Sequence, residues 1–127
     1  MIHGIGTDMV SVARIRQALA RHGDRFAYRI LAPSERQAYH DAPQPERLLA
    51  KRFAAKEAFG KAYGTGVAVP ATLHSVAIVR DALGKPHFEF HGAMADIVAR
   101  DGLRSHVSLS DELDYVVAFA VIEKDPA

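Results

Sequence analysis

The longest helical pattern in the chain covers residues 46–63 and constrains the fold more than any other segment. This stretch is rich in alanine, the residue with the highest helix propensity, and Gly64-Thr65-Gly66 ends it. A helix of this length needs a surface on which to pack its apolar side. We therefore predict a long central helix that lies against a sheet.

The other periodic segments are mostly strands, so the chain is expected to be α+β with a mainly antiparallel sheet. Ser11 and Gly23 are typical first and last caps of a helix, and residues 24–45 indicate only short helical pieces. A length of 127 residues fits one domain, 1–127. Strands are predicted at 1–10, 75–80, 87–90, 104–110 and 115–123, and shorter helices at 11–23 and 93–100.

Composition and charge exclude several classes of protein. A net charge of +1 argues against a general nucleic-acid binder. The chain has no cysteine, which excludes disulfides, thiol nucleophiles and cysteine zinc sites. No apolar run approaches the ~20 residues of a membrane span, and the N-terminus lacks the pattern of a signal peptide. A cytoplasmic protein is predicted.

Asp8 is the first candidate site residue. It interrupts an apolar strand on the side that also carries Gly4 and Gly6. Glycine within a strand often marks a place where another group approaches closely. Asp8 is therefore either a functional carboxylate or simply the residue that ends the strand and turns the chain into the next helix.

Glu57 and Lys61 are the next candidates. Together with Phe53 they occupy one i, i+4 row of the long helix, at the border of its apolar side. A carboxylate there needs a partner, because an unpaired buried charge is costly. The alternative is an ion pair between Glu57 and Lys61 on a solvated face, which contributes only about 0.3–0.5 kcal/mol.

Two polar segments complete the set of candidates. Gly64-Thr65-Gly66 has the small residues that let a backbone approach a phosphate or a flat ring, although Gly64 is also an ordinary helix stop. In the strand 104–110, His106, Ser108 and Ser110 share one face. That row suits phosphate or sugar binding, and it equally suits the wet side of an edge strand.

Taken together, these segments resemble the small holo-acyl-carrier-protein synthase family of phosphopantetheinyl transferases. The resemblance runs in order along the whole chain, and its first two motifs are the most specific. The residues that carry it are Gly4-Ile5-Gly6-Thr7-Asp8, Arg52-Phe53-Ala54-Ala55-Lys56-Glu57-Ala58 with Lys61, Gly64-Thr65-Gly66, Gly84-Lys85-Pro86 and His106-Val107-Ser108-Leu109-Ser110.

The resemblance implies an enzyme that moves 4′-phosphopantetheine from coenzyme A to a serine of apo-acyl carrier protein. Adenosine 3′,5′-bisphosphate is released, and the reaction supports fatty acid biosynthesis. Asp8 and Glu57 match the family's two metal ligands, and two carboxylates without a histidine cluster suit Mg²⁺ better than zinc.

The implied catalytic residues are Asp8, Glu57 and Lys61. Lys61 is expected to hold a phosphate oxygen or to protonate the leaving group. The serine proton is taken either by Glu57 or by a water that the metal holds, and the resemblance does not separate these two roles.

The resemblance also implies how the two substrates bind. The acidic carrier protein is expected to dock on a basic stripe of Arg14, Arg21 and Arg25, provided that the first helix continues past Gly23. The small members of the family form trimers with active sites between subunits, so a homotrimer is implied. The residues implied for coenzyme A are Arg52, Lys61, Gly64, Thr65, Gly66, His106 and Ser108.

Other interpretations remain at this point. In one interpretation, the acceptor is a carrier domain of a secondary-metabolite synthase. In another, the chain is a non-catalytic module that binds coenzyme A or a nucleotide. The pairing of Asp8 with Glu57 argues against a scaffold, which has no need of two carboxylates around a metal. A Mg²⁺-dependent nucleotide pyrophosphatase is a further alternative, but the chain lacks the dense run of glutamates on one helix that such hydrolases use.

Overall fold

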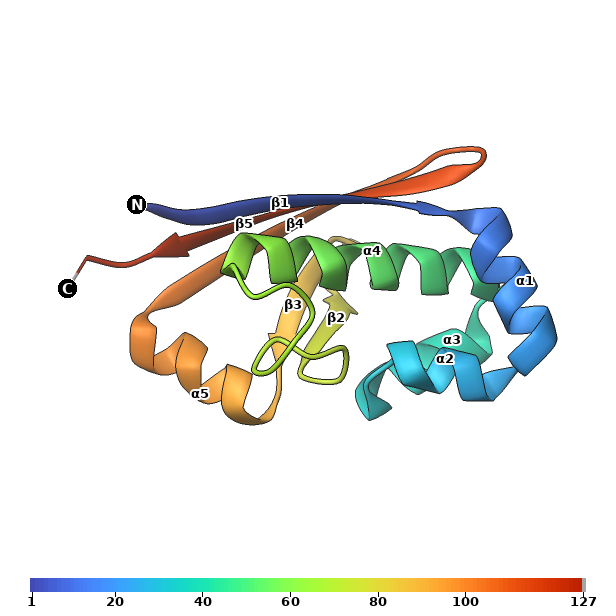
Figure 1. The fold of residues 1–127 in the computed structure, drawn as a ribbon, viewed down its shortest axis with the longest axis horizontal. Coiled ribbons are helices and arrows are strands. Elements are labelled where there is room, and N and C mark those ends of the chain that lie inside the picture. The colour runs from blue at the N-terminus through green and yellow to red at the C-terminus, as the bar shows by residue number, and fades with distance from the viewer. Residues whose placement is uncertain (127) are drawn as a thin grey trace.

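The structure, a computed structural model, describes residues 1–126 as an α+β fold in which the longest helix lies along a sheet (Figure 1). The predicted fold class is confirmed. No helix among these residues is long and apolar enough to cross a membrane. The elements are β1 (Ile2–Ser11), α1 (Val12–His22), α2 (Asp24–Ile30), a 3₁₀ turn (Pro33–Glu35), α3 (Arg36–Asp41), α4 (Pro45–Tyr63), β2 (Val76–Arg80), β3 (Pro86–Phe90), α5 (Gly92–Asp101), β4 (Leu103–Asp111) and β5 (Tyr115–Lys124).

The main sheet is antiparallel, with strand order β1-β5-β4, and α4 packs along one of its faces (Figure 1). Side chains alternate between the two faces of each strand. Ala118, Ala120 and Ile122 of β5 are fully buried beneath the helix, whereas Phe119 between them is 41% exposed on the other face. The sheet therefore has one covered face and one open face.

Gly4 and Gly6 bring β1 directly against α4. A Cβ atom at Gly4 would overlap the carbonyl oxygen of Ala62, and one at Gly6 would overlap that of Ala58. The strand carries glycine here because the helix backbone occupies the space of a side chain. Asp8 follows two residues later on the same face, so it also faces the helix.

A second, two-stranded sheet of β2 and β3 covers another side of α4. Phe88 and Phe90 of β3 each place their ring centroid 5.1 Å from that of Phe59 on the helix. Met94 of α5 is completely buried beside them. The strands and the helix predicted after residue 70 are confirmed, with ends that differ by at most one residue.

Helix α1 ends at Gly23, whose φ of 59° lies in the left-handed region that glycine adopts at low cost. At the other end, the Ser11 side chain accepts a hydrogen bond of 3.3 Å from the backbone nitrogen of Arg14. Both predicted caps are confirmed. The helix does not continue past Gly23, so Arg25 lies on α2 and does not share a helix with Arg14 and Arg21.

Candidate active site

Asp8 of β1 and Glu57 of α4 lie close enough for their charges to interact, and the side chain of Lys61 pairs with Asp8. The Lys61 ammonium donates to Oδ1 of Asp8 at 3.3 Å and to the backbone carbonyl of Thr7 at 2.8 Å. Glu57 lies one helical turn before Lys61. In the described part of the chain the ion pair of Lys61 is therefore with the strand, not the intrahelical pair with Glu57 that the sequence also allowed.

The electrostatics show that the two carboxyl groups interact. Burial raises the pKa of Glu57 above its ordinary 4.5, the negative charge of Asp8 raises it further, and the positive charge of Lys61 opposes both effects. Like charges disfavour each other's ionised form when they lie close together. Asp8 and Glu57 thus form an acidic pair, and Lys61 is its neighbouring cation.

A hollow of about 530 Å³, which we call the acidic hollow, opens beside this pair. It lies where β1 and the middle of α4 meet the starts of α1 and β5. The hollow is acidic at Asp8 and Glu57, basic at Arg14 and apolar at Phe53 and Ile15. Such a mixture of charges beside apolar walls is typical of a site that orients a polar ligand.

The donor set fits Mg²⁺. This ion takes oxygen ligands, keeps several waters, and commonly uses one or two carboxylates plus substrate phosphates. Asp8 and Glu57 supply two carboxylates whose mutual repulsion a divalent cation would relieve. Within residues 1–126 no group of three or more histidine, cysteine, aspartate or glutamate side chains is arranged around one metal position. Water and substrate oxygens would therefore have to complete the shell.

The loop after α4 starts next to Lys61. Gly64 ends the helix with a φ of 111°, and the hydroxyl of Thr65 donates to the carbonyl of Gly66 at 2.8 Å. Gly64 and Thr65 are exposed. The helix stop predicted at this position is confirmed, and the loop presents open backbone on the Lys61 side of the site.

Arg52 lies away from the acidic pair. It is buried, only 6% exposed, and its Nη1 donates to Oε2 of Glu35 at 3.2 Å. The structure therefore engages its guanidinium in the core. A contact between Arg52 and coenzyme A stays a prediction.

His106 and Ser108 lie on the open face of the main sheet, whereas Asp8 lies on the face that α4 covers. Both residues are exposed, Val107 between them is buried, and Nε2 of His106 lies 3.3 Å from Oε1 of Glu123. β5 also separates β4 from β1. One copy of the chain thus does not bring His106 or Ser108 to its own acidic pair.

Basic residues lie along α1 and α2, and one of them, Arg14, lines the acidic hollow. Arg14 and Arg21 lie on α1, and Arg25 lines a hollow of about 200 Å³ on α2 with His22, Phe26 and Arg29. Sequence reasoning found the cluster of arginines but not the aromatic ring among them. The turn at Gly23 creates this hollow, and a periodicity argument along a single helix does not reveal it.

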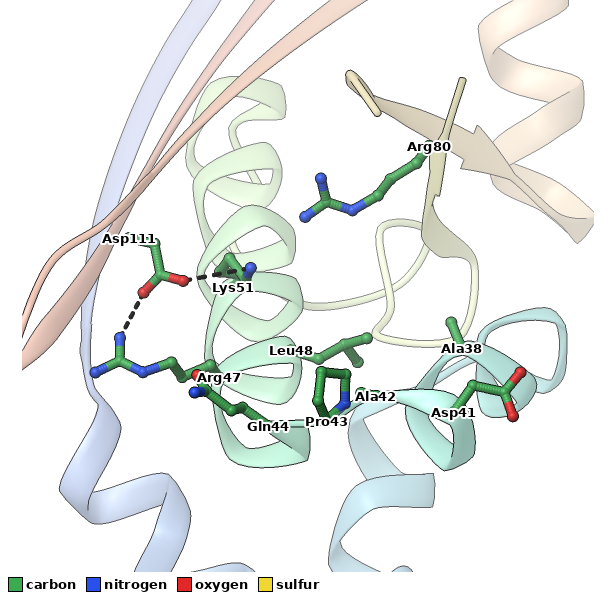
Figure 2. A pocket seen from close by; sticks show the side chains of 10 residues that line it. All are labelled: Ala38, Asp41, Ala42, Pro43, Gln44, Arg47, Leu48, Lys51, Arg80 and Asp111. Atoms are coloured by element: carbon green, nitrogen blue, oxygen red, sulfur yellow. Dashed lines mark hydrogen bonds and ion pairs between the residues drawn. The ribbon is translucent and has the colours of Figure 1, made fainter. Parts of the chain in front are cut away.

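A second basic hollow of about 310 Å³ lies between the first half of α4, the end of β2 and the end of β4 (Figure 2). Arg47, Lys51 and Arg80 line it, and Asp111 forms ion pairs with the first two, at 2.5 Å and 3.4 Å. Sequence reasoning missed these residues. Two cations at i and i+4 on the long helix were the available signal.

The chain matches known proteins along nearly its whole length. A model described as the 4′-phosphopantetheinyl transferase superfamily matches residues 4–120. The holo-[acyl-carrier-protein] synthase of Azoarcus sp. (strain BH72) is 64% identical over 123 residues, which are 97% of this chain and 98% of that protein.

Solved structures give the same result. The holo-[acyl-carrier-protein] synthase of Neisseria meningitidis superimposes with a TM-score of 0.92 at 47% identity, covering 98% of this chain and 100% of that one. The synthase of Bacillus anthracis str. Ames, solved in complex with CoA (3′,5′-ADP), has a TM-score of 0.82 at 31% identity. The match covers 98% of this chain and 99% of that one.

Proposed function

The chain belongs to the 4′-phosphopantetheinyl transferase superfamily, as one of its holo-[acyl-carrier-protein] synthases, and we propose that Asp8, Glu57 and Lys61 carry out its reaction. The enzyme transfers phosphopantetheine from coenzyme A to acyl carrier protein, a step that supports fatty acid synthesis. A cytoplasmic location and a single domain of 1–127 stay predictions of the sequence.

The observation that carries the proposal is the acidic pair at the edge of a hollow. Asp8 and Glu57 come from different elements, and the pKa of Glu57 is raised by burial and then by Asp8. Structural ion pairs elsewhere in the chain join opposite charges, whereas this arrangement joins like charges beside open space. Bound Mg²⁺ would neutralise the acidic pair and the phosphates of coenzyme A together.

In the proposed reaction, the serine Oγ of the carrier protein attacks the phosphorus that carries pantetheine. A new P–O bond forms to serine, the pyrophosphate P–O bond breaks, and adenosine 3′,5′-bisphosphate leaves. Glu57 is proposed to accept the serine proton, because its carboxylate lines the acidic hollow into which the serine would be presented. Lys61 holds a phosphate oxygen and stabilises the charge on the leaving group.

We assign the binding of coenzyme A to residues around this centre. Gly64, Thr65 and Gly66 follow Lys61 and are proposed to line the path of the pyrophosphate or the pantetheine arm, with Gly64 and Thr65 exposed. Arg52, His106 and Ser108 are proposed for the phosphorylated adenosine. Because His106 and Ser108 lie on the open face of the sheet, they are proposed to serve the site of a neighbouring copy.

A homotrimer with sites between subunits is therefore part of the proposal. The open face exposes Ile5, Met9 and Phe119 at 58%, 62% and 41%. Large apolar side chains gathered on one face are a sign of a protein interface. Sedimentation should give three times the mass of one chain for the native protein and a smaller species for Phe119→Glu. A monomeric native protein would contradict the trimer.

The carrier protein is proposed to dock over Arg14, Arg21 and Arg25. Arg14 lines the acidic hollow itself, so a protein held there would present its serine near Glu57. Charge reversal at Arg14 or Arg21 should mainly raise KM for the carrier. Lys124→Glu, with the same charge change at the far end of β5, should leave KM unchanged.

Intact-mass analysis tests the activity. Apo-acyl carrier protein incubated with coenzyme A, Mg²⁺ and the enzyme should gain one phosphopantetheine, and removal of metal with a chelator should abolish the gain. Glu57→Gln should lower kcat by roughly 100-fold or more while the fold is retained. Glu89→Gln, on β3 and outside the acidic hollow, is the matched control. Native kcat in Glu57→Gln would refute its role.

The same assay with two acceptors in competition resolves the choice of carrier. An apo-acyl carrier protein of fatty acid synthesis and a carrier domain of a secondary-metabolite synthase differ in mass, so their products separate. Preference for the second would replace the proposed acceptor and leave the chemistry unchanged.

A further inference from the structure

Lys61 forms an ion pair with Asp8, one of the two carboxylates that the proposed metal needs. Its Nζ lies 3.3 Å from Oδ1 of Asp8, and a second hydrogen bond of 2.8 Å to the carbonyl of Thr7 holds the ammonium on the strand. The Asp8 side chain is 20% exposed and that of Lys61 is 53% exposed. The ammonium thus pairs with a largely buried carboxylate, while about half of the lysine side chain is open to solvent.

One carboxylate oxygen serves a nearby ammonium and a divalent ion poorly at the same time. The two cations repel each other at contact distance, and water screens this repulsion only partly at a half-buried site. Lys61 also stands one turn from Glu57 on α4, so it borders both carboxylates of the pair. In the absence of metal, the positive charge of Lys61 partly offsets the repulsion between the two carboxylates.

Building on the proposed function, we propose that Lys61 competes with the divalent metal for Asp8, and that metal binding releases Lys61 to the phosphates of coenzyme A. The four-carbon stem of lysine permits this move, because its ammonium is a compact charge on a flexible chain. The helix keeps the released ammonium beside the site. The metal and the lysine thereby reach their working positions in one exchange.

The exchange has a measurable consequence for the metal alone, without any substrate. A lysine that competes for Asp8 weakens metal binding, so its removal strengthens binding. An exposed ion pair contributes about 0.2–1 kcal/mol, and about 1.4 kcal/mol corresponds to tenfold in affinity. The affinity gain from removing Lys61 is therefore expected to be about 1.4- to fivefold.

Electron paramagnetic resonance of Mn²⁺ tests this with the full-length protein. Lys61→Met should bind Mn²⁺ about 1.4- to fivefold more tightly than the native protein. Lys61→Arg, which keeps the charge, should bind nearly as the native protein does. Lys124→Met removes the same charge at the far end of β5 and should change nothing. Lys61→Gln provides a second neutral variant that retains a donor for the Thr7 carbonyl, should Lys61→Met fold poorly.

A double-mutant cycle locates the effect. In an Asp8→Asn background, Lys61→Met should no longer tighten Mn²⁺ binding, because the shared carboxylate is gone. Unchanged or weaker binding in both neutral variants of Lys61 would overturn the competition and leave the metal site standing. Failure of the native protein to bind Mn²⁺, or native affinity in Glu57→Gln, would overturn the metal site and the competition together.

Discussion

Nζ of Lys56 lies 2.5 Å from Oε1 of Glu35, and each side chain is only 1% exposed. The same ammonium donates to the backbone carbonyls of Ile30 and Leu73, at 2.6 Å and 2.7 Å. Glu35 in turn accepts hydrogen bonds from the backbone nitrogens of Ala32 and Ile78 and from Arg52. This buried ionic cluster joins the segments before α3 and β2 to α4 at Lys56, the residue that precedes Glu57 in the chain.

Breaking this pair on one side should be strongly destabilising. Burial lowers the pKa of Lys56 and the neighbouring Glu35 opposes that shift, so each charge depends on the other. Lys56→Met should lower the free energy of unfolding by about 3–5 kcal/mol, because it leaves a buried carboxylate with less compensation. Urea denaturation measures the loss.

Two further variants make that prediction specific. Adding both Glu35→Leu and Arg52→Met to Lys56→Met should recover part of the lost stability, since no unpaired charge of the cluster then remains. Arg104→Ala, which breaks an exposed pair with Glu123, should cost no more than about 1 kcal/mol. A Lys56→Met variant as stable as Arg104→Ala would contradict the role of the cluster.

Gly6→Ala should impair both stability and transfer. The added Cβ overlaps the carbonyl oxygen of Ala58, so β1 must move away from α4. Overpacking of this kind costs about 1–3 kcal/mol, and Asp8, two residues on, moves with the strand. Unfolding in urea should show the loss of stability, and intact-mass assays should show a reduced kcat.

The matched control for Gly6 is Gly102→Ala at the turn between α5 and β4. Gly102 has a φ of 63°, so alanine is strained there as well, but this turn does not carry the acidic pair. The Gly102→Ala variant should be less stable than the native protein and should keep the native kcat. Equal kcat for the two variants would show that the approach of β1 to α4 does not position Asp8.

The pKa of Glu57 in the metal-free protein should follow the charges of its neighbours. Asp8→Asn removes a negative charge that disfavours the ionised glutamate, so the pKa of Glu57 should fall. Lys61→Met removes a positive charge that favours it, so the pKa should rise. Carboxyl ¹³C chemical shifts followed through a pH titration measure both changes.

Asp41→Asn, at the end of α3, removes one negative charge outside the acidic hollow and should leave the Glu57 titration as it is. If the pKa of Glu57 is the same in Asp8→Asn as in the native protein, the two carboxyl groups do not share a site. The shared-metal proposal would then lose its electrostatic support.

Arg47 should control the mobility of the β4–β5 hairpin. Its guanidinium donates to Oδ1 of Asp111 and to the carbonyls of Glu112 and Leu113, at 2.5, 2.9 and 2.7 Å (Figure 2 shows the bond to Asp111). Arg47→Lys cannot reproduce this planar fork. The amide of Val12, which donates to the carbonyl of Asp114, should then exchange with solvent several-fold faster.

Hydrogen exchange followed by NMR measures this effect. Lys51→Met removes the other cation beside Asp111, at 3.4 Å, without touching the backbone contacts of the hairpin. Its Val12 amide should exchange nearly as in the native protein. Unchanged exchange in Arg47→Lys would show that the backbone alone holds the hairpin.

Much of the fold follows from local sequence. Alanine content predicted α4, alternation predicted β1, β4 and β5, and Ser11 and Gly23 predicted the limits of α1. These features depend on the residues within a few positions, because helix and strand periodicity and capping are local. The glycines at 4 and 6 likewise indicated a close approach, although the sequence alone did not identify the carbonyls of α4 as the approaching groups.

By itself, then, the sequence determined the elements, the family motifs and which side chains share a face. Only the tertiary structure decided the partners of the charges: Lys61 joins Asp8 instead of Glu57, Arg52 turns into the core toward Glu35, and His106 lies on the face opposite to Asp8. The physical reason is that ion pairs and buried contacts depend on distances between segments far apart in the chain. Periodicity along one helix or strand carries no information about those distances.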